Sequence, residues 1–253
     1  MKKYPSWLRT LFLSFCLATS AVSCGVTGQT EIRLPISVSS TGGDFSVGAW
    51  QISLTRAELG FGPLYFCATA AASASLCPSA VAEFSDTARV DLLRTAPNPL
   101  GELFGVTGVI NSATYDFGVV WGNTDRQPLA TPAAPDGHSA IFEGTATRGD
   151  TRFAFRAELD LLAQFQGARV IQGARTHVDL SKAAPGTAAL TVQFEPAVWF
   201  SQVDFDSLQA AGADTPVLIG PGTSAYNGLV IGIGALAPPT FVWRGVASKP
   251  EWQ

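Results

Sequence analysis

The strongest constraint on the fold is a strict alternation of apolar and polar side chains in residues 151–159. One parity carries mainly arginine and glutamate, and the other carries Phe153, Phe155, Ala157 and Leu159. Successive side chains of a β-strand point to opposite faces, so this pattern predicts a strand with one face in the core and one in water. Residues 139–146 and a Thr-Arg-Gly-Asp turn precede it, which predicts an antiparallel hairpin.

The same alternation recurs along the chain, and a change of parity near Thr55 indicates a bulge or bend. Helical spacing predicts short helices in 161–166 and 224–236. No internal repeat and no later linker are found, so the sequence predicts one domain over residues 31–253. Its expected class is mainly β, an antiparallel β-sandwich with one or two short helical insertions. Further strands are expected at 31–38, 45–54, 89–92, 104–110, 115–121, 188–194 and 240–244.

The chain is poor in charge, with 14% charged residues against about 25% in typical soluble domains. Lys2, Lys3 and Arg9 precede Cys24 and no acidic residue does, so 13 basic and 20 acidic residues follow, a net charge of −7. Phosphate contacts need grouped lysine and arginine, so this acidic balance excludes nucleic acid as an expected partner. An Ala-, Gly-, Ser-, Thr- and Val-rich composition is typical of exported β-domains.

Residues 1–23 have the three-part layout of a secretory signal: basic residues, a short apolar run in 10–18, then small residues. A membrane-spanning helix needs about 20 apolar residues, so this run is too short for one. The leader therefore predicts export from the cytoplasm.

Residues 21–24 (Ala-Val-Ser-Cys) resemble the lipobox of bacterial lipoproteins, with alanine where the consensus has leucine. The resemblance implies cleavage before Cys24, lipid on its thiol and amino group, and a tether over residues 24–30. Gly25, in place of an aspartate that retains such proteins in the inner membrane, implies transfer to the outer membrane. The alternative is ordinary signal-peptidase cleavage, which would release a soluble protein with a free cysteine.

Cys67 and Cys77 remain once Cys16 leaves with the leader and Cys24 carries lipid. An even pair in an oxidising compartment predicts a disulfide, which stabilises by roughly 2.7 kcal/mol on the chain-entropy model. A metal or redox pair is the alternative. The spacing is not Cys-x-x-Cys and no histidine lies nearby, which favours the disulfide.

No sequence motif predicts catalysis or a cofactor: the chain lacks a nucleophile elbow, a P-loop, a dinucleotide fingerprint, a zincin motif and an EF-hand loop. Its two histidines, His138 and His177, stand apart, so only folding could join them in a metal site. Asp204 and Asp206 are expected on one face of a strand, as solvated acids or as ligands for Ca²⁺. Five aromatic residues can fill the core or line a ligand groove: Trp50, Trp121, Trp199, Phe200 and Trp243.

Residues 137–155 (GHSAIFEGTATRGDTRFAF), with Leu190 and Val192, resemble the periplasmic β-sandwich partner proteins of methanobactin operons. The resemblance covers under half of the chain and rests on hairpin patterning. It implies a β-sandwich and an association with copper through histidine and an oxidised tryptophan. Only His138 falls on a comparable position.

These features predict a lipid-anchored exported envelope protein that acts as a non-enzymatic binding or structural module, with no catalytic residue, metal or cofactor. The expected partners are the membrane, through lipid on Cys24, and an envelope protein. The alternative is a periplasmic metal or small-ligand carrier that uses His138, His177 and nearby acids.

Overall fold

The computed structural model describes residues 28–70, 77, 80–122, 125–208 and 215–246. The chain divides into two compact units, Met1–Thr30 and Glu31–Gln253, and the fold below is that of the second. The predicted leader and Cys24 lie outside the described residues. Within the described part, no helix is both long enough and apolar enough to span a bilayer.

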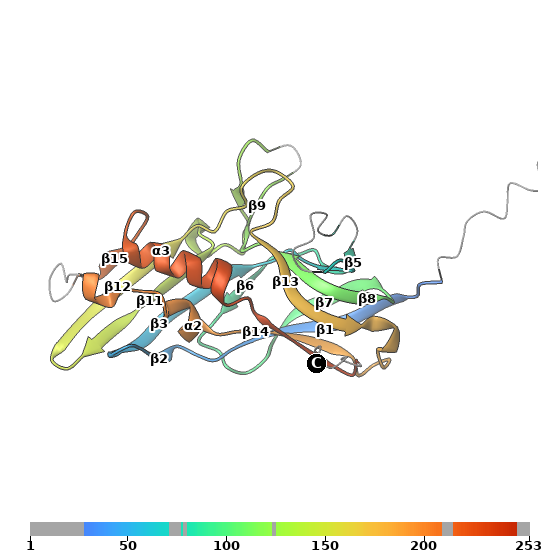
Figure 1. Cartoon of the computed structure of the whole chain (residues 1–253), viewed down its shortest axis with the longest axis horizontal. Coiled ribbons are helices and arrows are strands. Elements are labelled where there is room, and N and C mark those ends of the chain that lie inside the picture. The colour runs from blue at the N-terminus through green and yellow to red at the C-terminus, as the bar shows by residue number, and fades with distance from the viewer. Residues whose placement is uncertain (1–27, 71–76, 78–79, 123–124, 209–214, 247–253) are drawn as a thin grey trace, which may run out of the picture. The chain divides into compact units, whose positions relative to one another are not determined.

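Strands dominate the structure (Figure 1), which confirms the prediction of a mainly β fold with few short helices. The larger sheet has eight strands in the spatial order β13 (Ile171–Asp179), β8 (Val109–Tyr115), β4 (Leu64–Cys67), β5 (Ala80–Phe84), β7 (Asn98–Val106), β1 (Glu31–Ser40), β14 (Ala189–Phe194) and β16 (Thr240–Arg244). The six-stranded sheet has the order β15 (Val217–Ile219), β12 (Thr151–Leu159), β11 (Ala140–Arg148), β3 (Trp50–Phe61) and β2 (Asp44–Val47), with β6 (Ala88–Asp91) also paired to β3.

The remaining elements are short. A two-stranded pair and six short helical segments complete the described part: β9 (Val119–Val120), β10 (Leu129–Ala130), η1 (Pro135–Gly137), η2 (Leu180–Lys182), α2 (Pro196–Phe200), η3 (Phe205–Ser207), α3 (Ser224–Ile231) and η4 (Gly232–Leu236). Among the described strands, β1 with β14 and β12 with β15 pair in parallel, and the other paired strands are antiparallel.

The eight-stranded sheet curls until its edge strands, β13 and β16, approach each other. Trp243 on β16 donates its indole N–H to Thr176 Oγ1 on β13 at 3.3 Å. Inside the curl, the ring of Phe66 on β4 lies 5.1 Å from that of Trp243 and 5.2 Å from that of Phe241. Contacts between a middle strand and an edge strand need a strongly coiled sheet, so this sheet forms a nearly closed barrel around an aromatic core.

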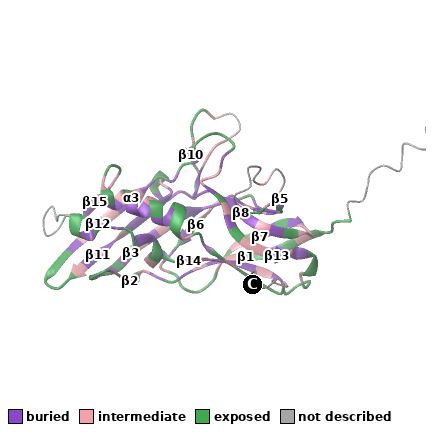
Figure 2. Cartoon of the chain, in the orientation of Figure 1, coloured by how far each residue is buried: buried purple, intermediate pink, exposed green. Residues whose placement is uncertain are grey.

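The six-stranded sheet buries its inner face against α2, α3 and η3. Phe142 of β11 lies 5.2 Å from Phe200, and Phe155 of β12 lies 5.7 Å from Phe205, between ring centroids. Figure 2 shows buried residues alternating with more exposed ones along β11 and β12, as the hairpin prediction requires. Three of the five aromatic residues considered for a groove are buried in the core: Trp50, Trp199 and Phe200.

Two local predictions are confirmed. The register of β11 against β3 shifts so that Glu143 pairs with Arg56 and Gly144 pairs with Leu54, which leaves Thr55 as the extra residue of a bulge. Cys67 and Cys77 form the predicted disulfide, with Cα atoms 4.9 Å apart.

The expected strands at 104–110 and 115–121 are wrong in their bounds. The chain turns at Thr107 and Gly108, so β7 ends at Val106, while β8 ends at Tyr115. The alternation of apolar residues continues across that turn, so the sequence pattern does not reveal where one strand ends and the next begins.

The predicted helix at 161–166 is absent. The Ser139 hydroxyl accepts from Leu161 N–H at 3.0 Å and donates to its carbonyl oxygen at 3.3 Å, so a bond to another loop replaces helical bonding. Asp204 and Asp206 do not share a strand face either. Asp204 caps η3, because its carboxylate accepts from the Asp206 N–H at 3.0 Å.

Candidate functional site

Two long connections run side by side, and we call them the paired loops: residues 116–122 with 125–139, and residues 160–170. The first joins β8 to β11 and the second joins β12 to β13. Tyr115 pairs with Ile171 across β8 and β13, and Ala140 pairs with Leu159 across β11 and β12. Both loops therefore connect the same two sheets through neighbouring strands, in opposite chain directions, near β9 in Figure 1.

Hydrogen bonds join the paired loops along their length. At the β11 end, Ser139 holds Leu161, as described above. Farther along, Trp121 Nε1 donates to the Ala163 carbonyl oxygen at 3.1 Å. Gln166 Nε2 donates to the Gly122 carbonyl oxygen at 2.8 Å. Hydrogen-bonded backbone groups move less, so these contacts hold the loops in one conformation before any partner binds.

Asp116 fixes the second loop to the barrel. Its buried carboxylate accepts from Arg169 Nη1 at 2.7 Å and from Val170 N–H at 2.8 Å. Burial raises the pKa of the Asp116 carboxyl above its usual value, although the Val170 and Arg169 hydrogen bonds act in the opposite direction. The Arg169 guanidinium also lies 4.8 Å above the Tyr65 ring, so the end of the second loop is attached to Asp116, directly after β8, and to β4.

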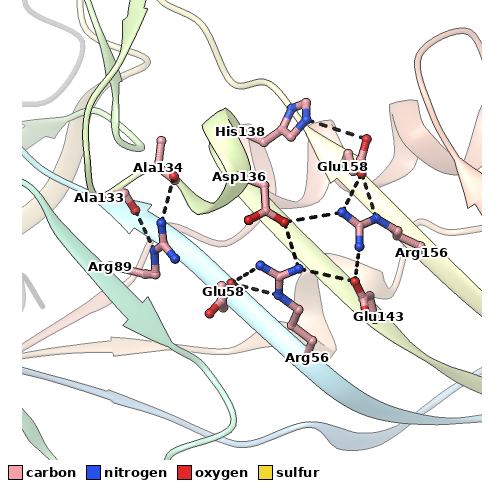
Figure 3. A network of polar contacts seen from close by, with 10 residues as sticks. All are labelled: Arg56, Glu58, Arg89, Ala133, Ala134, Asp136, His138, Glu143, Arg156 and Glu158. Atoms are coloured by element: carbon pink, nitrogen blue, oxygen red, sulfur yellow. Dashed lines mark hydrogen bonds and ion pairs between the residues drawn. The ribbon is translucent and has the colours of Figure 1, made fainter.

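A charged face on the outer side of the six-stranded sheet fixes the first loop (Figure 3). In the row across β3, β11 and β12, Arg56 and Arg156 flank Glu143 and both pair with it. Asp136, from η1, accepts from Arg56 Nη1 at 3.0 Å and lies 3.5 Å from Arg156 Nη2. Glu58 and Glu158 occupy the next outward position of their strands and bind the same two guanidinium groups.

This network shifts the acid–base properties of its members. The hydrogen bond from Arg56 lowers the pKa of the Asp136 carboxyl below its usual value. Hydrogen bonds to Asp136 and Glu58 raise the pKa of Arg56, and the bond to Glu158 raises that of Arg156. All three residues therefore stay charged at neutral pH, and attraction among them holds η1 against the sheet.

The backbone of the first loop is held as well. Arg89 of β6 donates to the carbonyl oxygens of Ala133, at 3.5 Å, and Ala134, at 3.2 Å. Asp136 has a φ of +49° and Gly137 one of +89°, so η1 makes a turn that few side chains adopt.

Apolar side chains are exposed on the paired loops. Leu129 is 48% exposed, Leu162 is 49% exposed and Phe165 is 63% exposed. Exposed aromatic and aliphatic side chains on a fixed scaffold are typical of surfaces that bind another molecule. Sequence patterns did not identify them, because exposure in a loop has no periodic signal.

The histidines lie in separate networks. His138 belongs to the first loop, where its Nδ1 lies 3.0 Å from Asp160 Oδ1 and its Nε2 lies 3.6 Å from Glu158 Oε2. His177, on β13, has its Nδ1 2.7 Å from Asn111 Oδ1 on β8. The described ranges contain no group of three or more histidine, cysteine, aspartate or glutamate side chains arranged to hold a metal ion.

No protein-family model matches the chain, and no curated protein matches it in sequence. Among solved structures, the chain is similar to MbnP from Methylosinus trichosporium, with a TM-score of 0.35 and 10% sequence identity over 74% of this chain and 83% of that one. This is a structural similarity to a methanobactin-operon protein at a low score.

Proposed function

We propose that this chain is a lipid-anchored exported protein that acts as a non-enzymatic binding module, and that the paired loops bind an apolar patch on an envelope partner. One observation carries the proposal: Phe165, 63% exposed, lies on a loop whose conformation is fixed from both ends and along its length. A fixed loop loses little conformational entropy on binding, so its exposed apolar area contributes more fully to affinity.

The charged residues around the loops support a binding role over a catalytic one. Asp136 bridges Arg56 and Arg156, and Asp116 is bonded to Arg169 and Val170. These groups hold the loops in place through bonds within the protein. The surface offered to a partner is therefore the apolar one.

The anchor in this proposal is lipid on Cys24. It rests on the lipobox-like residues 21–24 and on the leader that precedes them. Cys24→Ser should abolish acylation and leave uncut precursor, whereas mature protein of normal mass from that variant would show cleavage by the general signal peptidase.

A metal or small-ligand carrier is the second candidate. It rests on the imidazole of His138. The carboxylates near it, Asp160 at Nδ1 and Glu158 at Nε2, lie at different ring nitrogens and do not form a three-residue metal group with it. On this account, metal analysis of the purified protein would find stoichiometric metal that His138→Ala removes. His177→Ala would change the metal content only if the two histidines act together.

The binding proposal is tested by replacing the apolar side chains of the second loop. Leu162→Ser with Phe165→Ser should abolish co-purification of a stoichiometric partner from detergent-solubilised native membranes. Leu218→Ser is the matched control, since Leu218 is 59% exposed on β15, outside the paired loops. Undiminished partner recovery with the double variant would contradict the proposal.

A further inference from the structure

Four strand ends meet at one rim of the barrel. Glu31 at the start of β1 pairs with Val106 at the end of β7. Val109 at the start of β8 pairs with Asp179 at the end of β13. We call this set, with its neighbour Phe104, the anchor rim; β1 begins there, toward the right of Figure 1.

The anchor rim is the part of the domain that a lipid on Cys24 would restrain most. Six residues lie between Cys24 and Glu31, and the seven Cα–Cα steps that join these two residues span at most about 25 Å when fully extended. That reach is comparable to the size of a small domain. A domain held this closely must present some surface to the bilayer, and the rim at the tether is the nearest one.

Two apolar side chains are exposed near the point where the tether joins. Phe104 and Val109 are each 43% exposed, one on each strand that flanks the β7–β8 turn. The Arg33 guanidinium lies 5.2 Å above the Phe104 ring. An aromatic ring beside a long basic side chain suits the boundary between acyl chains and headgroups, where the ring is buried and the charge stays in water.

Charges around the rim are nearly balanced. Arg33 lies beside Glu31 at 3.3 Å and Glu102 at 3.8 Å, and Lys182 lies 3.3 Å from Asp179. Paired charges give little attraction to anionic lipid. Contact at this rim would therefore depend on apolar burial and on the tether, and hardly on lipid charge.

We infer that the anchor rim lies against the bilayer, with Phe104 and Val109 in its interfacial region. The inference rests on the proposed lipid anchor. It places the membrane at the rim where β8 begins and β7 and β13 end. The paired loops lie at the other end of these barrel strands, after the end of β8 and before the start of β13.

Spin labels on the mature acylated protein test this orientation. Phe104→Cys and Val109→Cys are labelled with a nitroxide in separate proteins, and Leu218→Cys serves as the control. The Cys67–Cys77 disulfide and the acylated Cys24 leave no other thiol to react. Collision with oxygen, which enriches in the bilayer, is compared with collision with a water-soluble nickel chelate. The vesicles contain phosphatidylcholine alone or phosphatidylcholine with phosphatidylglycerol.

Labels at 104 and 109 should favour oxygen in both kinds of vesicle, and the label at 218 should favour the chelate. Acylated protein whose labels at 104 and 109 meet the chelate as freely as the control would overturn the inference and leave the binding proposal standing. Oxygen preference seen only with phosphatidylglycerol would overturn it too, because the contact would then be electrostatic. A mature mass without acyl chains on Cys24 would overturn the proposed anchor and the inference together.

Discussion

Trp121 donates its indole N–H to the carbonyl oxygen of Ala163, 42 residues away in sequence, at 3.1 Å. This bond joins the first loop, near its β8 end, to the second loop. The fixed attachments lie on either side of it: Ser139 with Leu161 toward β11, and Asp116 with Arg169 toward the barrel. Together with the bonds of Ser139 to Leu161, of Gln166 to Gly122 and of Asp116 to Arg169, it joins the two loops into one surface.

Trp121→Phe should loosen the second loop while keeping an aromatic ring in place. The variant removes the donor to Ala163, and a lost hydrogen bond of this kind costs about 1 kcal/mol. Faster amide exchange in residues 160–170 is expected, with little change in β11 and β12. Hydrogen exchange with mass spectrometry measures it, and exchange at the wild-type rate would show that the loops are held without this bond.

Asp136→Asn should release η1 from the sheet at neutral pH. Asparagine also adopts positive φ, so the loss should come from the charge. Because the folded-state pKa of Asp136 lies below its usual value of 3.8, its stabilising contribution is present above that value and is lost as the pH falls through the folded-state pKa. The melting temperature of the variant should thus be lower than wild type at pH 7, and the difference should shrink under acid conditions.

Asp150→Asn, in the turn between β11 and β12, is the control for this change. A difference between wild type and Asp136→Asn that stays constant between pH 7 and pH 3 would mean that charge pairing with Arg56 and Arg156 does not hold the turn.

Alternation specified the sheets but not the loops between them. The period of two in residues 151–159 predicts both the buried face, with Phe155, and the charged face, with Arg156, and the structure has both. The change of parity at Thr55 likewise marks a real bulge. These are local properties of a strand, so they can be read from neighbouring residues.

The loop pairing depends on contacts between residues far apart in sequence. The sequence indicates Trp121 only as a core or groove aromatic, and it gives no signal for Asp116, Arg169 or Phe165. Ser139 bonds Leu161 where a helix was expected, because β11 and β12 bring their ends together. No pattern in a single segment contains that information, since it arises from the order of strands in two sheets.

Arg169→Met should destabilise the barrel end of the paired loops by about 1–3 kcal/mol, because it leaves a buried carboxylate with one fewer charge-assisted hydrogen bond. Burial raises the pKa of Asp116 in the folded protein. As the pH drops through that pKa the carboxylate becomes protonated, and the folded state no longer contains a buried charge that lacks its Arg169 partner. The difference in unfolding free energy between wild type and Arg169→Met, measured by chemical denaturation, should therefore decrease from pH 7 toward pH 4. Adding Asp116→Asn should remove this pH dependence, and a deficit that instead grows toward acid would refute the assignment.

Gly232→Ala should destabilise the contact between η4 and α2. A Cβ at Gly232 would overlap the carbonyl oxygen of Trp199, whereas a Cβ at Gly234 would meet nothing within 4 Å. Overpacking of this kind costs about 1–3 kcal/mol. Gly234→Ala, two residues along the same element, should be neutral or slightly stabilising, since alanine favours helices. Equal unfolding free energies for the two variants would contradict the packing account.

Photo-crosslinking from position 165 in native membranes tests the binding role of the paired loops most directly. Phe165→p-benzoylphenylalanine places a reactive ketone on the most exposed apolar side chain of these loops, and the same substitution at Leu218 provides the control. The account predicts one discrete crosslinked product from position 165, weakened by Leu162→Ser and absent from position 218. Crosslinking that is absent at 165, or equal in pattern and yield at 165 and 218, would contradict it.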